Sequence, residues 1–151
     1  MSRQGSVASR TEAPPGFIRK AFPRARYHPR WRLLTWYPLG VLNEAFADQV
    51  IEFIQMEERI QEAPFDRYAD LSGLTHIRIG IDRIIHTARR RRKVKQLVKS
   101  ALFADNPLGF SVAHSYELLM CDAMIEVRAF KEPVAAAAWL EVPLRTLECP
   151  W

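Results

Sequence analysis

Short apolar runs alternate along this chain with longer segments that carry apolar residues at helical spacing. One such run, residues 98–104, is almost continuously apolar, which is typical of a strand buried on both faces of a sheet. The clearest helical stripe consists of Ile77, Ile81, Ile84, Ile85 and Ala88. Alternation of strands and helices requires crossover connections, and these favour parallel strands. We therefore predict a single α/β domain with a mostly parallel sheet of four to five strands and helices packed against it.

The spacing of apolar residues and the helix-capping residues place the individual elements. We expect strands over residues 31–37, 39–42, 65–71, 98–104 and 124–130. The second of these segments, residues 39–42, is short enough to be a turn instead. Helices are predicted to begin at the N-cap residues Asn43, Thr75 and Asn106. The first of these helices ends before Pro64, and a last helix begins at Pro133.

The chain of 151 residues is long enough for one domain with one core. Residues 1–27 are rich in Ser, Pro, Gly and Arg and show no sustained apolar period, so we predict a flexible basic N-terminal tail. An organelle transit peptide or a misplaced start codon would give the same composition. The predicted domain spans residues 28–142, and residues 143–151 form a predicted C-terminal tail.

The composition disfavours several classes of protein. No apolar run approaches the roughly 20 residues that a membrane-spanning helix needs. Cys121 and Cys149 form no CxxC pair, and the four histidines lack ligand spacing with them, so we predict neither a disulfide framework nor a metal site. The sequence has no Gly-rich phosphate loop. We therefore expect a cytoplasmic protein that uses no metal and no cofactor.

Three stretches of the sequence have a familiar order and spacing. Residues 70–74 read Asp-Leu-Ser-Gly-Leu after a strand, and they are followed by residues 101–107 and 125–140. The first stretch resembles the strand and turn of STAS domains, the group that includes the anti-sigma factor antagonists. The other two are similar to a SpoIIAA-like bacterial branch, whose members mostly lack an assigned biochemical role. The resemblance implies a STAS-like fold, and this branch is also structurally akin to CRAL-TRIO lipid-transfer domains.

The chain departs from the anti-sigma factor antagonists at one functional position. Those proteins carry a phosphorylatable serine at the start of the helix after this turn, in an Asp-Ser-Ser-Gly pattern. The corresponding residues here are Arg78, Ile79 and Gly80. Because isoleucine has no hydroxyl group, we expect the phospho-serine switch to be absent.

Polar residues follow two of the predicted strands. Ligands of parallel α/β sheets bind at the carboxyl ends of the strands. The candidate ligand-binding residues are Asp70, Ser72, His76, Asp105 and Asn106. A structural role explains several of them equally well, since Asp70 and Ser72 suit a turn and Asn106 suits a helix cap.

Five consecutive cations form a second candidate site. The run comprises Arg89, Arg90, Arg91, Arg92 and Lys93. Like charges repel one another, so an anion or an acidic partner would stabilise them. A solvated helix end is the alternative reading, because cations at a helix C-terminus complement the helix dipole. The run contains no aromatic residue for stacking on bases, which disfavours nucleic acid as the partner.

The helix predicted after Asn106 carries a second apolar stripe on the side away from its core-facing residues. This stripe consists of Phe110, His114, Leu118 and Cys121. A helix that covers one face of a sheet is normally polar on its outer side. The stripe therefore predicts a partner interface, and we favour a homodimer contact.

These features together favour a non-catalytic binding or regulatory module that acts through protein–protein contacts. The alternative is a small domain that binds an apolar ligand or a lipid, and an enzyme that uses acids at strand ends is the most distant alternative. A closed apolar cavity behind the first helix would favour ligand binding, and a solid core with an exposed helix stripe would favour a protein partner. Convergence of Asp70, His76 and Asp105 in an open cleft would favour catalysis.

Overall fold

The computed structural model describes residues 18–19 and 24–151 of the chain. The strands are β1 (Ile18–Arg19), β2 (Ala25–His28), β3 (Leu33–Trp36), β4 (Gly40–Leu42), β5 (Asp66–Asp70), β6 (Leu74–Ile77), β7 (Val98–Phe103) and β8 (Ile125–Phe130). The α-helices are α2 (Glu44–Ile60), α3 (Ile81–Arg91), α4 (Pro107–Leu119) and α5 (Pro133–Leu140). Short 3-10 helices span Pro29–Trp31, Leu71–Gly73 and Leu144–Leu147.

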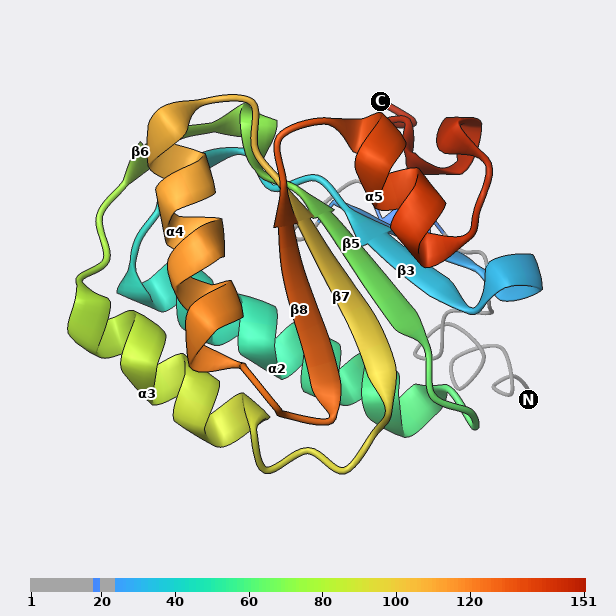
Figure 1. Cartoon of the computed structure of the whole chain (residues 1–151), viewed down its shortest axis with the longest axis horizontal. Helices are drawn as coiled ribbons and strands as arrows, with labels where there is room; N and C mark the ends of the chain where they lie inside the picture. The colour runs from blue at the N-terminus through green and yellow to red at the C-terminus, as the bar shows by residue number, and fades with distance from the viewer. Residues whose placement is uncertain (1–17, 20–23) are drawn as a thin grey trace, which may run out of the picture.

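The main sheet has the strand order β1-β2-β3-β5-β7-β8 (Figure 1). The strands β3, β5, β7 and β8 are mutually parallel, as the alternating pattern predicts. Strand β2 extends this sheet antiparallel to β3, and β1 pairs antiparallel with β2. A separate pair of short parallel strands, β4 and β6, lies beside it. The predicted α/β fold class is confirmed.

The helices cover both faces of the sheet (Figure 1). On one face, α5 packs over a core that includes Leu33, Tyr68 and Ala101. On the other face lie α2, α3 and α4, and there Leu34 and Ala69 are buried. Neighbours in one strand, such as Leu33 and Leu34, are thus both buried, because successive side chains point to opposite faces. This explains why residues 33–34 of β3 and 101–103 of β7 are consecutive apolar residues.

Two predicted caps hold the helices in place. The side chain of Asn43 accepts a hydrogen bond from the backbone N–H of Phe46 at 2.8 Å, and α2 follows it directly. The side chain of Asn106 accepts from the N–H of Gly109 at 2.7 Å at the start of α4. In the part of the chain that the structure describes, no helix has the length and apolar character needed to cross a membrane.

The predicted helix cap at Thr75 is wrong. Residues Leu74–Ile77 form strand β6, which pairs in parallel with β4, and α3 begins four residues later at Ile81, after Gly80. Thr75 and Ile77 are β-branched and suit an extended strand once a neighbouring strand offers hydrogen bonds. Pairing between distant segments therefore decided the conformation here.

The folded unit also begins earlier than residue 28. Strand β2 starts at Ala25, which is 1% exposed, and Tyr27 packs edge-on against Phe65 with ring centroids 5.9 Å apart. Alternate residues of β2 therefore face the core beneath α2. The remainder of the predicted tail, apart from β1, lies outside the described residues.

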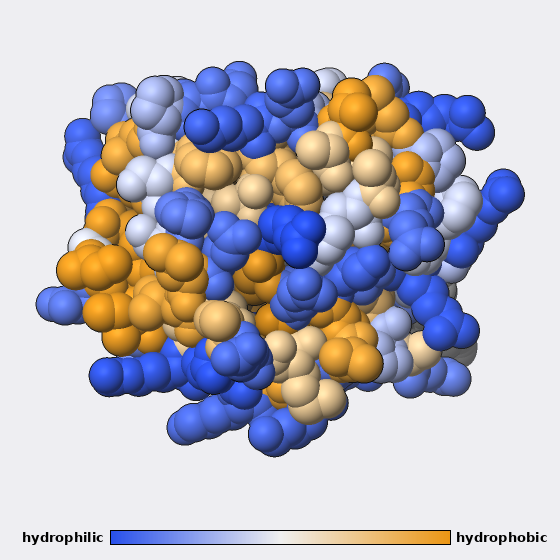
Figure 2. Space-filling model, in the orientation of Figure 1, coloured by the Kyte–Doolittle hydropathy of each residue, from blue (hydrophilic) through white to orange (hydrophobic). Residues whose placement is uncertain are grey.

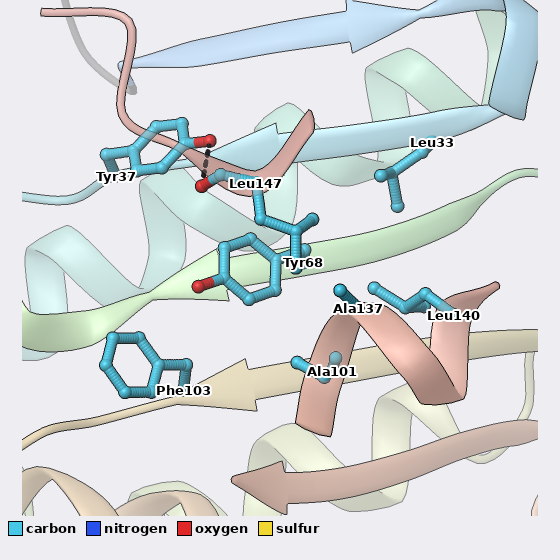
Figure 3. Close-up of a cluster of buried hydrophobic side chains, with 9 residues drawn as sticks. Leu33, Tyr37, Tyr68, Ala101, Phe103, Ala137, Leu140 and Leu147 are labelled. Atoms are coloured by element: carbon cyan, nitrogen blue, oxygen red, sulfur yellow. Dashed lines mark hydrogen bonds between the residues drawn. The ribbon is translucent and has the colours of Figure 1, made fainter. Parts of the chain in front are cut away.

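The C-terminal segment is part of the core, although the sequence suggests a tail from residue 143. Leu147 is 3% exposed and packs in the cluster beneath α5 (Figure 3). The hydroxyl of Tyr37 donates hydrogen bonds to the carbonyl oxygens of Leu147 and Glu148, at 2.9 and 3.1 Å. Trp151 packs edge-on against the ring of Tyr37. The predicted domain limits of 28 and 142 are therefore too narrow at both ends.

Candidate functional site

The residues of the predicted polar site after β5 lie at the end of β5, in the 3-10 turn and in strand β6, and the hydroxyl of Ser72 is buried without a hydrogen-bond partner among the described residues. One carboxylate oxygen of Asp70 accepts a hydrogen bond from the backbone N–H of Ser72 at 2.9 Å, which caps the short 3-10 helix. His76 lies in β6 with an exposed side chain, and its ring is hydrogen-bonded to the adjacent Thr75. The turn role considered for Asp70 and Ser72 thus accounts for the observed contact.

Asp105 and Asn106 line a different depression, which we call the strand-end pocket. It has a volume of about 360 Å³ at the carboxyl end of β7. The lining residues are Ala104, Asp105, Asn106, Pro107, Phe110, Ser111, His114 and Lys131. Asp70, Ser72 and His76 do not contribute to it, so the three groups of the catalytic alternative do not converge in this pocket. Among residues 18–19 and 24–151, no three His, Cys, Asp or Glu side chains are grouped to hold a metal ion.

The second stripe of α4 lies on the surface, as the sequence predicts. Leu118 is 63% exposed, and Cys121 is exposed as well. Phe110 is half-buried and its ring stacks on that of His114, with centroids 5.9 Å apart. Figure 2 shows that apolar side chains gather over α3 and α4 on this face. The predicted contact of this stripe with another protein remains a prediction.

The arginine run does not form one continuous cationic surface. Four of its members are exposed, but Arg91 is only 3% exposed. The spacing of Ile84, Ala88 and Arg91 places all three on the inner side of α3. Arg92 donates to the backbone carbonyls of Leu119 and Cys121, at 3.2 and 2.6 Å, and so fastens α3 to the end of α4. The predicted anion-binding surface must therefore omit Arg91.

An apolar cavity lies between the sheet and the three helices α2, α3 and α4. Its volume is about 160 Å³, and apolar groups form most of its surface. Each of the three helices and the strands β3, β5, β7 and β8 contributes to its walls. Representative apolar lining residues are Trp36, Val50, Ile84, Leu102 and Val112. We call this space the helix–sheet cavity.

Two arginines in the lining of the helix–sheet cavity share one acid on α2. Arg67 and Arg91 both line the cavity, and each donates a hydrogen bond from Nη2 to the same Oε2 atom of Glu58, at 2.5 Å. The two arginines come from β5 and α3, and Glu58 comes from α2. Both arginine side chains are 4% exposed and that of Glu58 is 12% exposed. We call these three residues the buried charge cluster.

Tyr116 of α4 also lines the cavity, and its hydroxyl group interacts electrostatically with the three residues of the buried charge cluster. Burial raises the pKa of Tyr116 to about 12, while the positive charges of Arg91 and Arg67 act in the opposite direction. The hydroxyl group of Tyr116 therefore keeps its proton at neutral pH and can donate a hydrogen bond.

Sequence reasoning missed the helix–sheet cavity and the roles of Glu58 and Arg67. One signal was present: Arg67 comes directly before two apolar residues, Tyr68 and Ala69, in the same predicted strand, and Phe65 lies two residues before it. Arginine is rarely fully buried unless it is paired, so its position predicts a buried ion pair. The identity of the partner was not readable, because Glu58 is one of several acids in α2.

Among solved structures, the chain is similar to an uncharacterised protein of the DUF3478 family from Shewanella loihica PV-4, which is described as having a SpoIIAA-like fold. The two are 14% identical, the match covers 72% of this chain and 83% of that chain, and the TM-score is 0.50. No protein-family model and no curated protein sequence matches the chain. At this level of identity the likeness concerns the fold alone. The chain thus has a SpoIIAA-like α/β fold, which confirms what its resemblance to STAS domains implied.

Proposed function

We propose that this domain binds a small, mostly apolar molecule in the helix–sheet cavity. The observation that carries the proposal is an apolar space of about 160 Å³ behind α2. Protein interiors contain few voids larger than a water molecule. The helix–sheet cavity is partly open to solvent, so a ligand can enter it from outside, and removal of its apolar surface from water would favour binding.

The size and polarity of the cavity limit the occupant. A dry apolar cavity of about 150 Å³ holds a molecule such as benzene, so we expect an occupant of about six to ten non-hydrogen atoms. Most ligand pockets are larger, at about 300–1,000 Å³. The proposal therefore favours a small molecule over a complete lipid, and it favours binding over catalysis.

Toluene is a suitable neutral probe for this proposal. We expect toluene to shift the NMR methyl signals of Ile84, Leu102 and Val112, which line the cavity. The variant Val50→Phe should abolish these shifts, because Val50 lines the cavity, is 8% exposed, and would place the larger ring inside it. The same ring at the exposed neighbour in Gln49→Phe is the matched control and should leave binding unchanged. Equal shifts in Val50→Phe and the parent protein, or none in the parent, would contradict the proposal.

A second candidate function is protein binding through the outer stripe of α4, with a second copy of the chain as the partner. The exposed Leu118 and the apolar side chains that gather over α3 and α4 (Figure 2) favour this candidate. We expect Leu118→Glu to lower the mass measured by light scattering from that of a dimer to 17.5 kDa, the mass of one chain. Val134→Glu is the control, since Val134 is equally exposed but belongs to α5. A monomeric parent protein, or an unchanged mass in Leu118→Glu, would rule this candidate out.

A further inference from the structure

The buried charge cluster contains one more positive charge than negative charge. Glu58 contributes one negative charge, whereas Arg67 and Arg91 contribute one positive charge each, which leaves a net charge of +1. All three side chains are removed from bulk water, and an uncompensated charge is unfavourable in such surroundings. The face of the Phe65 ring lies 4.7 Å from the guanidinium carbon of Arg67 and compensates only part of that charge. The cluster is therefore suited to one further anion.

A hydrogen-bond donor of this cluster is also unused. Arg67 is only 3% exposed. Its Nε atom is buried and has no hydrogen-bond partner among the described residues. Its Nη2 atom is engaged by Glu58 and, at 3.3 Å, by Gln96. Buried polar groups are nearly always paired, so the Nε–H of Arg67 lacks the acceptor that such groups usually have, and Arg67 as a residue lines the helix–sheet cavity.

The chemistry of the missing acceptor follows from the lining of the cavity. Arg67, Arg91 and Tyr116 are polar members of the lining that interact with one another. Arg83, Thr87 and Ser100 also line the cavity, but the charge of Arg83 is paired with Asp48, and the remaining lining residues are apolar. Arginine favours carboxylates, whose two oxygens accept several hydrogen bonds at once. We propose that the occupant is a small apolar monocarboxylate, with its carboxylate against Arg67 and its apolar part along the helix–sheet cavity. This inference rests on the proposed function and specifies the ligand class.

A charge of −1 matches the excess charge of the cluster. A phosphate monoester would bring a second negative charge that no residue of the cluster balances. A neutral apolar molecule would leave both the excess charge and the unused N–H of Arg67 without a partner. The monocarboxylate is therefore the ligand class that satisfies both features.

Benzoate and benzamide are matched probes, because they share a ring and differ mainly in charge. We expect the full chain to bind benzoate at least tenfold more tightly than benzamide in calorimetric titrations. Arg67→Met should bring the two affinities to within about twofold, since it removes both the excess charge and the unused donor. Arg90→Met is the control, because Arg90 precedes Arg91 in the same run and is exposed. This control should keep the preference for benzoate.

The outcomes separate this inference from the proposed function. If toluene binds but benzoate and benzamide bind equally well, the carboxylate is wrong and the apolar-ligand proposal stands. If neither toluene nor benzoate binds, both are wrong. Should Arg67→Met fail to fold, Arg91→Met provides the second test, since it leaves Glu58 paired with Arg67 and removes the excess charge. Retention of a tenfold preference in Arg91→Met would overturn the inference.

Discussion

Glu58→Gln is expected to lower the free energy of unfolding by about 3–5 kcal/mol, the usual cost of removing one partner from a buried ion pair. The change leaves Arg67 and Arg91 facing each other without an anion in a site that is nearly closed to water. Glutamine retains the shape of the side chain, so the loss measures charge rather than packing. Chemical denaturation monitored by circular dichroism would measure the effect.

The control for this experiment is Glu52→Gln, which alters an exposed acid on the same helix. Changes at exposed positions are usually within about 0.5 kcal/mol of zero. If the two variants have the same stability, the buried charge cluster makes no net contribution, and the charge argument for a carboxylate ligand loses its physical basis.

Leu147→Ala is expected to lower the free energy of unfolding by about 2–5 kcal/mol, as truncations of buried leucines do. Leu147 is enclosed by side chains of β3, β5 and α5 in the core shown in Figure 3. Its carbonyl oxygen also accepts the hydrogen bond from the buried Tyr37 hydroxyl at 2.9 Å. The cost should therefore resemble that of a core residue, even though Leu147 is only four residues from the C-terminus.

Leu144→Ala tests the same segment at an exposed position, because Leu144 is 42% exposed. We expect this control to lose much less stability in the same denaturation experiment. An equal, small loss in both variants would mean that residues 144–151 do not dock on the core in solution, and the predicted tail from residue 143 would then be correct.

Much of the fold is readable from local sequence patterns. Apolar runs predict β3 and β7, and the alternation of apolar and charged residues predicts β8. The caps at Asn43 and Asn106 predict the starts of α2 and α4 within one residue. These features are local, because a cap needs only its own first turn and a buried strand needs only a continuous apolar run. The α/β fold class follows from their alternation.

Two further features, strand β2 and the burial of Arg91, could have been predicted from the sequence. Residues 25–28 alternate Ala, Arg, Tyr and His, which is the two-residue period of a strand with one buried face. Arg91 continues the helical stripe of Ile84 and Ala88, so its burial was implied by spacing. In both cases a basic composition concealed the periodicity.

The sequence alone determined most of the apolar faces of the helices and central strands, and hence the α/β class and the parallel orientation of those strands. Only the tertiary structure decided that Leu74–Ile77 pairs as a strand, that Leu147 completes the core, and that Glu58 meets both arginines across three elements. Periodicity records that a residue is buried but not which distant residue it meets. The volume left between three helices and a sheet depends on how they pack together, so the helix–sheet cavity belongs to the tertiary structure.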